Sequence, residues 1–277
     1  NIFKLFPATK IDSVKFTKFI KGNAIESFVD SYDYNSIKCH SISNALVTGK
    51  SSFIFITTEK IVLGLDKDIK NIRFSEDLRF RRIEESFSLP ETRPYKLVLA
   101  MSILEGASSN FAHFLLVCLP QISMLKTTQY ADIPILVDAD IHINFYRLIY
   151  MIHPSANLIR VPLDVSVEVK NLIYITPISQ FPFETDVTQN SCNFSSSGFK
   201  ALLADFELAH PRNIIKRPGM NKYFLQRGSY YRNIINENEV ESALLKEGYL
   251  ILNPSELSVQ EQITIYREAD IIISPSG

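Results

Sequence analysis

The chain has 277 residues, of which 46% are hydrophobic and 21% are charged. These proportions suit a globular protein and exclude the collagen, coiled-coil and disordered classes. The formal net charge is −1 and no stripe of Lys and Arg stands out, so nucleic-acid binding has no electrostatic footprint. The length suits about two domains, on a prior of roughly 100–200 residues per domain.

The cysteines and the first residues of the chain indicate the cellular compartment in which the protein works. Cys39, Cys118 and Cys192 form no C-x-x-C pair, which disfavours a zinc site, and their odd number favours a reducing compartment. The first residues lack the apolar core of a signal peptide, and no apolar run reaches the ~18–20 residues of a membrane span. We expect a cytoplasmic protein, with peripheral membrane association left open and the secretory lumen as the alternative. Both chain ends look like cuts in a longer protein.

The first half of the chain predicts strands and helices in alternation. A β-hairpin is expected within 52–65. Apolar runs predict strands at 96–101, 133–137 and 157–161, and a helix is expected over 110–126 with a kink at Pro120. Asp140 is placed to N-cap a second helix that runs to about residue 152. The order β-α-β-α-β is half of a doubly wound parallel sheet.

A second series follows a polar connection. Short strands are expected within 165–176 and a helix within 199–208. Further strands are predicted at 222–226, 249–252 and 271–274. Between them, Asn236 with Glu239 and Ser258 with Glu261 have the spacing of capping boxes, and Gly248 is placed to stop the first of the two helices.

Two β-α-β-α-β series predict an α/β fold with two facing Rossmann-like domains. We assign 1–195 and 196–277 to these two domains, the first with extra N-terminal strands and the second cut short at its C-terminus. Ligands of such folds bind at the carboxyl ends of the strands.

Candidate phosphate ligands follow two strands of the second series. Arg227 and Arg232 flank a loop just before a helix start, and a diphosphate needs bidentate donors and free backbone amides. The alternative is two surface arginines paired with Glu237 or Glu239. The small residues of 274–277 offer amides to a phosphate, or form a plain turn.

Candidate bases lie in the first series. His113 falls in the first turn of a helix at a strand's carboxyl end, where a transferase needs a group that takes the acceptor's proton. The alternative is a core histidine between Phe111 and Phe114. Glu105 is the second candidate base, or a solvated loop carboxylate.

One further pattern points to a metal. Asp138 and Asp140 form a D-x-D triplet that could hold a metal-bound nucleotide sugar, or simply end a strand and cap a helix. No G-x-S-x-G, G-x-G-x-x-G or P-loop motif is present, so hydrolase, dinucleotide and P-loop classes lack support.

These patterns together resemble glycosyltransferase family 61 over roughly residues 95–277. That family shows an N-[YF]-x-H-[FW] element, an Arg and a second Arg five residues later, an N-E pair, a Glu-Gln pair and a small-residue turn. The corresponding residues here are Asn110 and His113; Arg227, Arg232, Asn236 and Glu237; Glu261 and Gln262; and Ser274 to Gly277.

The resemblance implies a GT-B fold and inverting transfer from a nucleotide sugar without an essential metal. It also implies that 1–195 is the acceptor domain and 196–277 the nucleotide-sugar-binding domain. It implies His113 as base or acceptor-site residue and Asn110 as support for the helix start. It implies a donor site that includes Arg227 and Arg232, which bind the diphosphate, and Asn236, Glu237, Glu261, Ser274, Ser276 and Gly277.

We therefore predict a hexosyl- or pentosyltransferase that uses a nucleotide diphosphate sugar and a glycan hydroxyl, in surface polysaccharide synthesis. A non-catalytic nucleotide- or glycan-binding module of the same fold is the alternative. A metal-dependent GT-A transferase that uses Asp138 and Asp140 is a third interpretation. Residues 1–94 match no pattern, so the acceptor stays unassigned.

Overall fold

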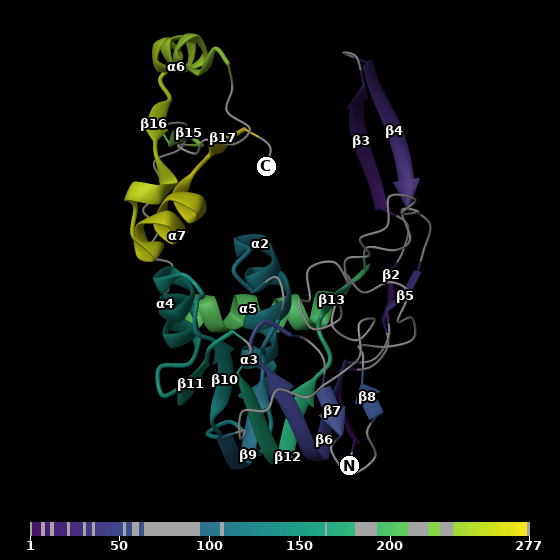
Figure 1. The fold of residues 1–277 in the computed structure, drawn as a ribbon. Helices are drawn as coiled ribbons and strands as arrows, with labels where there is room; N and C mark the ends of the chain where they lie inside the picture. Colours follow the sequence, from purple (N-terminus) through teal and green to yellow (C-terminus); the bar gives the residue numbers. More distant parts are fainter. Residues whose placement is uncertain are drawn as a thin grey trace, which may run out of the picture. The chain divides into compact units, whose positions relative to one another are not determined.

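The chain divides into two compact units, Asn1–Ala209 and His210–Gly277. Figure 1 draws the elements of both. This computed structural model describes residues 2–6, 9–11, 14–20, 23–29, 32–34, 37–51, 54–56, 61–63, 95–105, 108–163, 165–180, 193–209, 221–227 and 235–275. The assignment of 1–195 and 196–277 to acceptor and donor functions stays a prediction.

A mixed sheet forms the centre of the first unit. The strands run in the order β11-β10-β9-β12-β6-β7-β8, and β1 pairs with β6. Strands β9 to β12 are parallel to one another, whereas β1, β6, β7 and β8 make antiparallel pairs. Their bounds are β1 Ile2–Phe6, β6 Ile37–Thr48, β7 Ile54–Ile56, β8 Ile61–Leu63, β9 Tyr95–Ser102, β10 Ile135–Asp138, β11 Leu158–Val161 and β12 Ser166–Ile175.

The three expected parallel strands are confirmed as β9, β10 and β11, and the expected hairpin is confirmed as β7 with β8. The prediction of several short strands within 165–176 was wrong. That stretch is the single strand β12, which stays regular because β9 pairs with one edge and β6 with the other. The first unit's sheet is therefore mixed rather than purely parallel.

Three further strand pairs lie outside this sheet. Each is antiparallel: β2 (Thr9–Ile11) with β5 (Tyr32–Tyr34), β3 (Val14–Ile20) with β4 (Asn23–Val29), and β13 (Ser179–Gln180) with β14 (Asn193–Phe194).

The sheet curls strongly. Val161, at the end of β11, pairs with Asp138 beyond the end of β9, whereas Val167 pairs with Tyr95 at the start of β9. In a flat sheet Val161 and Val167 would lie about 30 Å apart along the strand direction. The six residues from Val161 to Val167 span at most about 20 Å. The connection therefore closes only because the sheet bends round.

Contacts at the end of β6 show which strand ends the bending of the sheet brings together. Leu163 forms a parallel bridge to Gly49, whose amide donates to the Val165 carbonyl at 3.0 Å. The chain after β11 thus meets the chain after β6. A buried core composed of strand and strand-end residues lies within this curl: Ala45, Val47, Ile54, Ala100, Leu104, Leu136, Val161, Val167, Val169 and Leu172.

Gly49 sits in this contact without room for a side chain. A Cβ atom there would lie 2.0 Å from the Pro162 carbonyl oxygen. We expect Gly49→Ala to lower the free energy of unfolding by about 3 kcal/mol, as overpacking against backbone does. Thermal unfolding of the first unit checks this, with Ser43→Ala on the exposed part of the same strand as the near-neutral control. An unchanged melting temperature for Gly49→Ala would contradict this expectation, because it would show that the backbone at Pro162 moves aside at no cost.

One helical segment carries the first candidate residues. It consists of α2 (Phe111–His113), the π-helix η2 (Phe114–Cys118) and α3 (Leu119–Leu125), which confirms the expected helix. Pro120 lies in the first turn of α3. Proline lacks an N–H and its ring crowds the carbonyl four residues earlier. The irregularity expected at Pro120 therefore takes the form of a wide π turn just before it.

The helices α4 (Ile143–Ile152) and α5 (Ser196–Ala209) pack with α3, which also contacts β12. Asp140 does not cap α4, so that prediction was wrong. The helix begins later, and the His142 ring nitrogen Nδ1 accepts from the Asn144 amide at 3.2 Å. Asp140 lies in the preceding turn, where its carboxylate pairs with Lys50.

The second unit has the predicted alternation of strands and helices. Its elements are β15 Lys222–Leu225, α6 Glu237–Lys246, β16 Leu250–Leu252, the 3-10 turn η4 Pro254–Glu256, α7 Val259–Glu268 and β17 Ile271–Ile273. The strands are all parallel in the order β16-β15-β17. This confirms the second β-α-β-α-β series.

Local capping explains where these helices begin and end. Ser258 and Glu261 form the predicted capping box, with side-chain to amide distances of 3.2 and 2.7 Å. Gly248 has a φ of 81° and ends α6. The Tyr249 amide then donates to the Leu244 carbonyl at 3.0 Å, as in a Schellman motif.

The capping box predicted for Asn236 and Glu239 was wrong. Within the described residues the Asn236 side chain makes no capping bond to the backbone, and its Nδ2 lies 3.4 Å from the Glu239 carboxylate. The two side chains pair with each other because Asn236 leaves the extended backbone that an N-cap uses, with φ −109° and ψ 39°.

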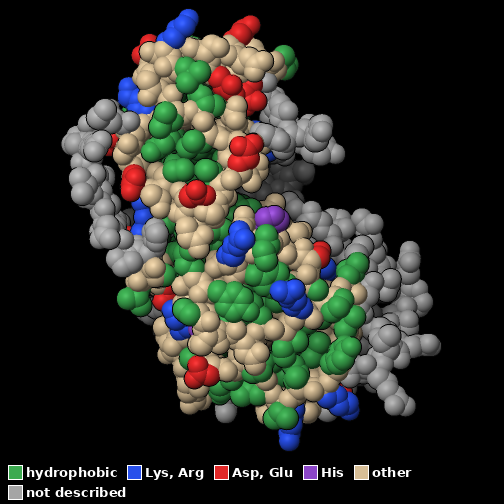
Figure 2. Space-filling model, turned by 90° about the vertical axis from the view of Figure 1, so that its left-hand side faces the viewer, with side chains coloured by type: hydrophobic (Ala, Val, Ile, Leu, Met, Phe, Trp, Pro, Cys, Tyr) green, Lys and Arg blue, Asp and Glu red, His purple; other side chains and the backbone are tan. Residues whose placement is uncertain are grey.

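Hydrophobic side chains also reach the surface. On the face drawn in Figure 2 they are mixed with Lys, Arg, Asp and Glu side chains. On α4, Ile143 and Tyr150 are exposed by 53% and 45%. Exposed single apolar residues are common on globular proteins and indicate no partner by themselves. Within the described ranges, none of the helices has the length and apolar character that a bilayer crossing demands.

Candidate active site

Asn110 sets the start of the helical segment beside the ends of β9 and β10. Its backbone is extended, and its side-chain oxygen accepts from the His113 amide at 3.1 Å. This is an N-cap, which satisfies one of the free amides at a helix start. This hydrogen bond fixes the turn that carries His113, and the part of Asn110 in the site stays a prediction.

His113 and Glu105 face each other. The His113 Nε2 atom lies 3.6 Å from a Glu105 carboxylate oxygen, and the two side chains are exposed by only 14% and 18%. Within the described residues Nε2 is buried and has no partner at hydrogen-bond distance. A small movement would bring the carboxylate into a hydrogen bond with the ring, and burial limits its screening by water.

The two phenylalanines that flank His113 in the sequence both pack against Phe145. Phe114 is buried and stacks on Phe145 with ring centroids 4.4 Å apart. Phe111 is 52% exposed and lies 5.8 Å from the same ring. The rings of Phe111 and Phe114 thus lie against Phe145, whereas the imidazole of His113 faces a carboxylate. The roles of His113 as a base and as a buried core histidine both stay predictions.

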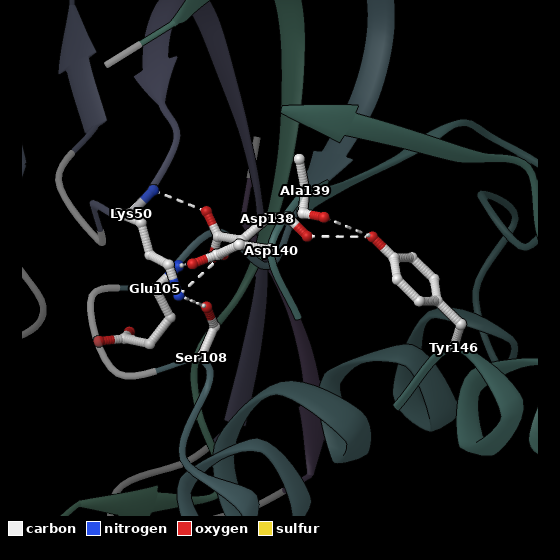
Figure 3. Close-up of polar contacts among 7 residues, drawn as sticks. All are labelled: Lys50, Glu105, Ser108, Asp138, Ala139, Asp140 and Tyr146. Carbon is white, nitrogen blue, oxygen red and sulfur yellow. Dashed lines mark hydrogen bonds and ion pairs between the residues drawn. The ribbon is translucent and has the colours of Figure 1, made fainter. Parts of the chain in front are cut away.

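Asp138, at the end of β10, is joined to the segments of Lys50 and Glu105 (Figure 3). One carboxylate oxygen accepts from the Lys50 amide at 2.6 Å and the other from the Glu105 amide at 3.1 Å. The Lys50 ammonium lies 3.0 Å from the Ser108 hydroxyl and 3.0 Å from the Asp140 carboxylate. The Lys50 side chain, 12% exposed, thus forms an ion pair with the exposed Asp140 carboxylate, and its charge acts to lower the pKa of Asp138.

The protonation preferences follow from burial. Burial raises the pKa of Asp138, and the opposing effects are hydrogen bonds from Ser108, Lys50 and Glu105 and the Lys50 charge. Burial also raises the pKa of the Cys118 thiol, and the negative charges of Glu105 and Asp138 act in the same direction. Cys118 is therefore held as a thiol and is unsuited to act as a nucleophile here.

A small cavity lies next to Glu105. It offers about 20 Å³ to the centres of water molecules, which is room for one or two waters. Its lining includes Ser102, Glu105, Cys118 and Gln121. The cavity can hydrate the Glu105 carboxylate but cannot hold a sugar.

The second unit brings the described donor-site candidates to one edge of its sheet. Arg227 and Glu237 follow β15, Glu261 follows β16, and Ser274 follows β17. Because the three strands are parallel, these residues all lie at their carboxyl ends. Arg232, Ser276 and Gly277 lie outside the described residues.

Contacts at this edge engage some of those side chains already. The Glu261 carboxylate caps α7, and its hydrogen bonds to Ser258 lower its pKa. The Ser274 hydroxyl donates to the Pro275 carbonyl at 3.3 Å. Gln226 lies 2.5 Å from Glu241, which ties the end of β15 to α6. The roles of these residues toward a donor stay predictions.

Comparison with known families decides the identity. The profile described as Glycosyltransferase 61 matches residues 111–277. The chain belongs to the glycosyltransferase 61 family. A search of curated proteins finds no match.

Family membership implies glycosyltransferase activity in general, with a sugar donor and an acceptor. The glycosyltransferase 61 match includes His113 and the whole second unit but begins after Glu105. Both candidate regions, the His113 turn and the carboxyl edge of the second sheet, thus lie in or directly beside the matched part.

Sequence reasoning missed Lys50 and Ser108, and it gave Asp138 only a metal-binding or strand-ending role. Lys50 has a φ of 59°, a left-handed conformation unusual for lysine, directly after Gly49. A Gly-Lys pair after a long apolar strand is a weak local signal of such a turn. Nothing local connects it with Asp138, which lies 88 residues away.

Proposed function

We propose that this glycosyltransferase 61 member moves a hexosyl or pentosyl group from a nucleoside diphosphate sugar to a glycan hydroxyl, with inversion and without an essential metal. The observation that carries the proposal is the pairing of His113 with Glu105, 3.6 Å apart and largely buried beside the ends of β9 and β10. A growing surface glycan is the acceptor we propose.

The reaction is a single displacement. The acceptor oxygen attacks the anomeric carbon while His113 takes the hydroxyl proton, and the bond from that carbon to the diphosphate oxygen breaks with its electron pair. Attack from the face opposite the leaving group inverts the anomeric centre. Glu105 orients the imidazole and stabilises the imidazolium that forms, as a carboxylate does beside a catalytic histidine.

Arg227 and Arg232 stabilise the departing nucleoside diphosphate. Planar guanidinium groups form bidentate hydrogen bonds with phosphate oxygens, and such contacts strengthen as charge develops on the leaving group. The position of Arg227 after the central strand of a parallel sheet supports this assignment.

Three contacts support a reaction without a metal. Both oxygens of Asp138 accept backbone amides, and Asp140 pairs with the Lys50 ammonium at 3.0 Å. A divalent cation at the D-x-D pair would have to displace these partners and repel Lys50. The alternative of a metal-dependent transferase predicts that EDTA abolishes turnover, whereas we expect turnover to persist.

The test is a transfer assay with the full-length protein. UDP-, GDP- and CMP-sugars are offered with a panel of glycan acceptors, and the anomeric configuration of the product is read by NMR. We expect transfer from one UDP- or GDP-sugar with inversion, in EDTA as without it. Binding without transfer or hydrolysis would favour the non-catalytic module instead, and a retained configuration would exclude single displacement.

A further inference from the structure

Asp138 is the most completely engaged carboxylate of the first unit's site. It is 1% exposed, and each of its oxygens accepts from the backbone amide of a different segment. The Ser108 side chain also acts to lower the pKa of this carboxyl. A buried carboxylate with this many donors is held in one orientation, because losing any of them would leave charge uncompensated.

The segment that Asp138 holds on one side is that of Glu105. Glu105 follows the end of β9, and hydrogen bonds of the backbone hold the described residues before it. The Ile103 amide donates to the Leu136 carbonyl at 3.1 Å, the Leu104 amide to the Ser102 hydroxyl at 3.3 Å, and the Glu105 amide to the Asp138 carboxylate at 3.1 Å. The Ser108 amide then donates back to the Glu105 carbonyl at 3.0 Å. The backbone of Glu105 is thus pinned at its amide and at its carbonyl.

Asp138 is itself held from the other side. The Tyr146 hydroxyl lies 3.2 Å from the Asp138 carbonyl oxygen and 3.4 Å from that of Ala139 (Figure 3). Lys50 completes the arrangement, with its amide on Asp138 and its ammonium on Ser108. The end of β10 is therefore a rigid support rather than a free strand end.

We propose that Asp138 is a positioning residue, which fixes the Glu105 backbone so that the Glu105 carboxylate faces His113. The inference rests on the proposed function, in which His113 is the base. Asp138 acts through a backbone amide, so a side chain that only resembles it in shape cannot replace it. Asparagine keeps the size but offers one acceptor oxygen, and its amide group would face a second N–H donor.

A double-mutant cycle on the full-length protein tests this. We expect Asp138→Asn to lower kcat about 10- to 100-fold, because small misplacement of a catalytic group has that effect. Donor KM should stay within about twofold, since the interaction lost acts on the chemical step. In a Glu105→Gln background the same substitution should lower kcat less than about twofold. Asp132→Asn, an exposed aspartate before the same strand, is the matched control.

The outcomes separate the two claims. If His113→Gln keeps full activity, the base assignment fails and this inference falls with it. If His113→Gln is impaired but Asp138→Asn and Glu105→Gln act additively, only the positioning role is overturned. Should Asp138→Asn fail to fold, Ser108→Ala enters the same cycle, because its hydroxyl lies 3.0 Å from the ammonium of Lys50, whose backbone amide holds the Asp138 carboxylate. Non-additivity with Glu105→Gln then supports the role and additivity refutes it.

Discussion

Replacing His113 with glutamine should lower the transfer rate about 10²- to 10⁴-fold, the range that a general base contributes. Glutamine keeps hydrogen-bonding groups near Glu105 but cannot take a proton from the acceptor. Donor affinity should stay unchanged, because the step lost is the chemical one. Initial rates at saturating donor, together with calorimetric donor binding, measure both quantities.

Two further variants make that experiment specific. Glu105→Gln should lose less than His113→Gln, because Glu105 orients and stabilises the ring rather than accepting the acceptor's proton. His142→Asn is the matched control, since His142 is exposed and caps α4 through its ring, a role that asparagine also fills. Equal activity of wild type and His113→Gln at equal donor affinity would remove His113 from the mechanism.

Local sequence signals predicted the second unit well because its structure is local. Ser258 and Glu261 are three residues apart and form the expected box, and Gly248 ends α6 with the expected left-handed backbone. Parallel strands joined by single helices leave few topologies open. The carboxyl edge, and hence the placement of Arg227 and Ser274, followed from the strand order alone.

The first unit resisted prediction where its contacts are distant in sequence. Thr48 pairs with Ser166 across 118 residues, and this pairing makes the sheet mixed and curled. Register between strands so far apart is set by the packing of their faces and leaves no pattern within either strand. The role of Asp140 was missed for the same reason. Its local sequence predicts a helix cap, whereas its carboxylate pairs with the distant Lys50.

The candidate site shows the same division. Asn110 and His113 are three residues apart on one helical turn, so their relation was visible in the sequence. His113 and Glu105 face each other because of the path that the chain takes after β9, where Asp138 holds the Glu105 amide. Asp138 reaches the Glu105 amide across 33 residues and the Lys50 amide across 88. Hydrogen bonds to backbone amides select no residue type at the donor, so no motif marks them.

Replacing Arg227 or Arg232 should also lower the transfer rate strongly. We expect Arg232→Ala and Arg227→Ala each to lower kcat/KM about 10²- to 10³-fold, as loss of one stabilising donor in a transition state does. Arg→Lys variants should lose less, because lysine keeps the charge but not the planar fork. Arg267→Ala is the matched control, since Arg267 lies in the last turn of α7, away from the carboxyl edge.

The charge of that edge explains why the arginines should matter so much. The first turn of α6 already carries Glu237 and Glu239, and the first turn of α7 carries Glu261. These carboxylates offset the positive helix ends that would otherwise attract an anion. A diphosphate therefore needs guanidinium groups to outweigh them. Full transfer by Arg232→Ala at unchanged donor affinity, or a donor complex in which the two arginines point apart, would place the leaving group elsewhere.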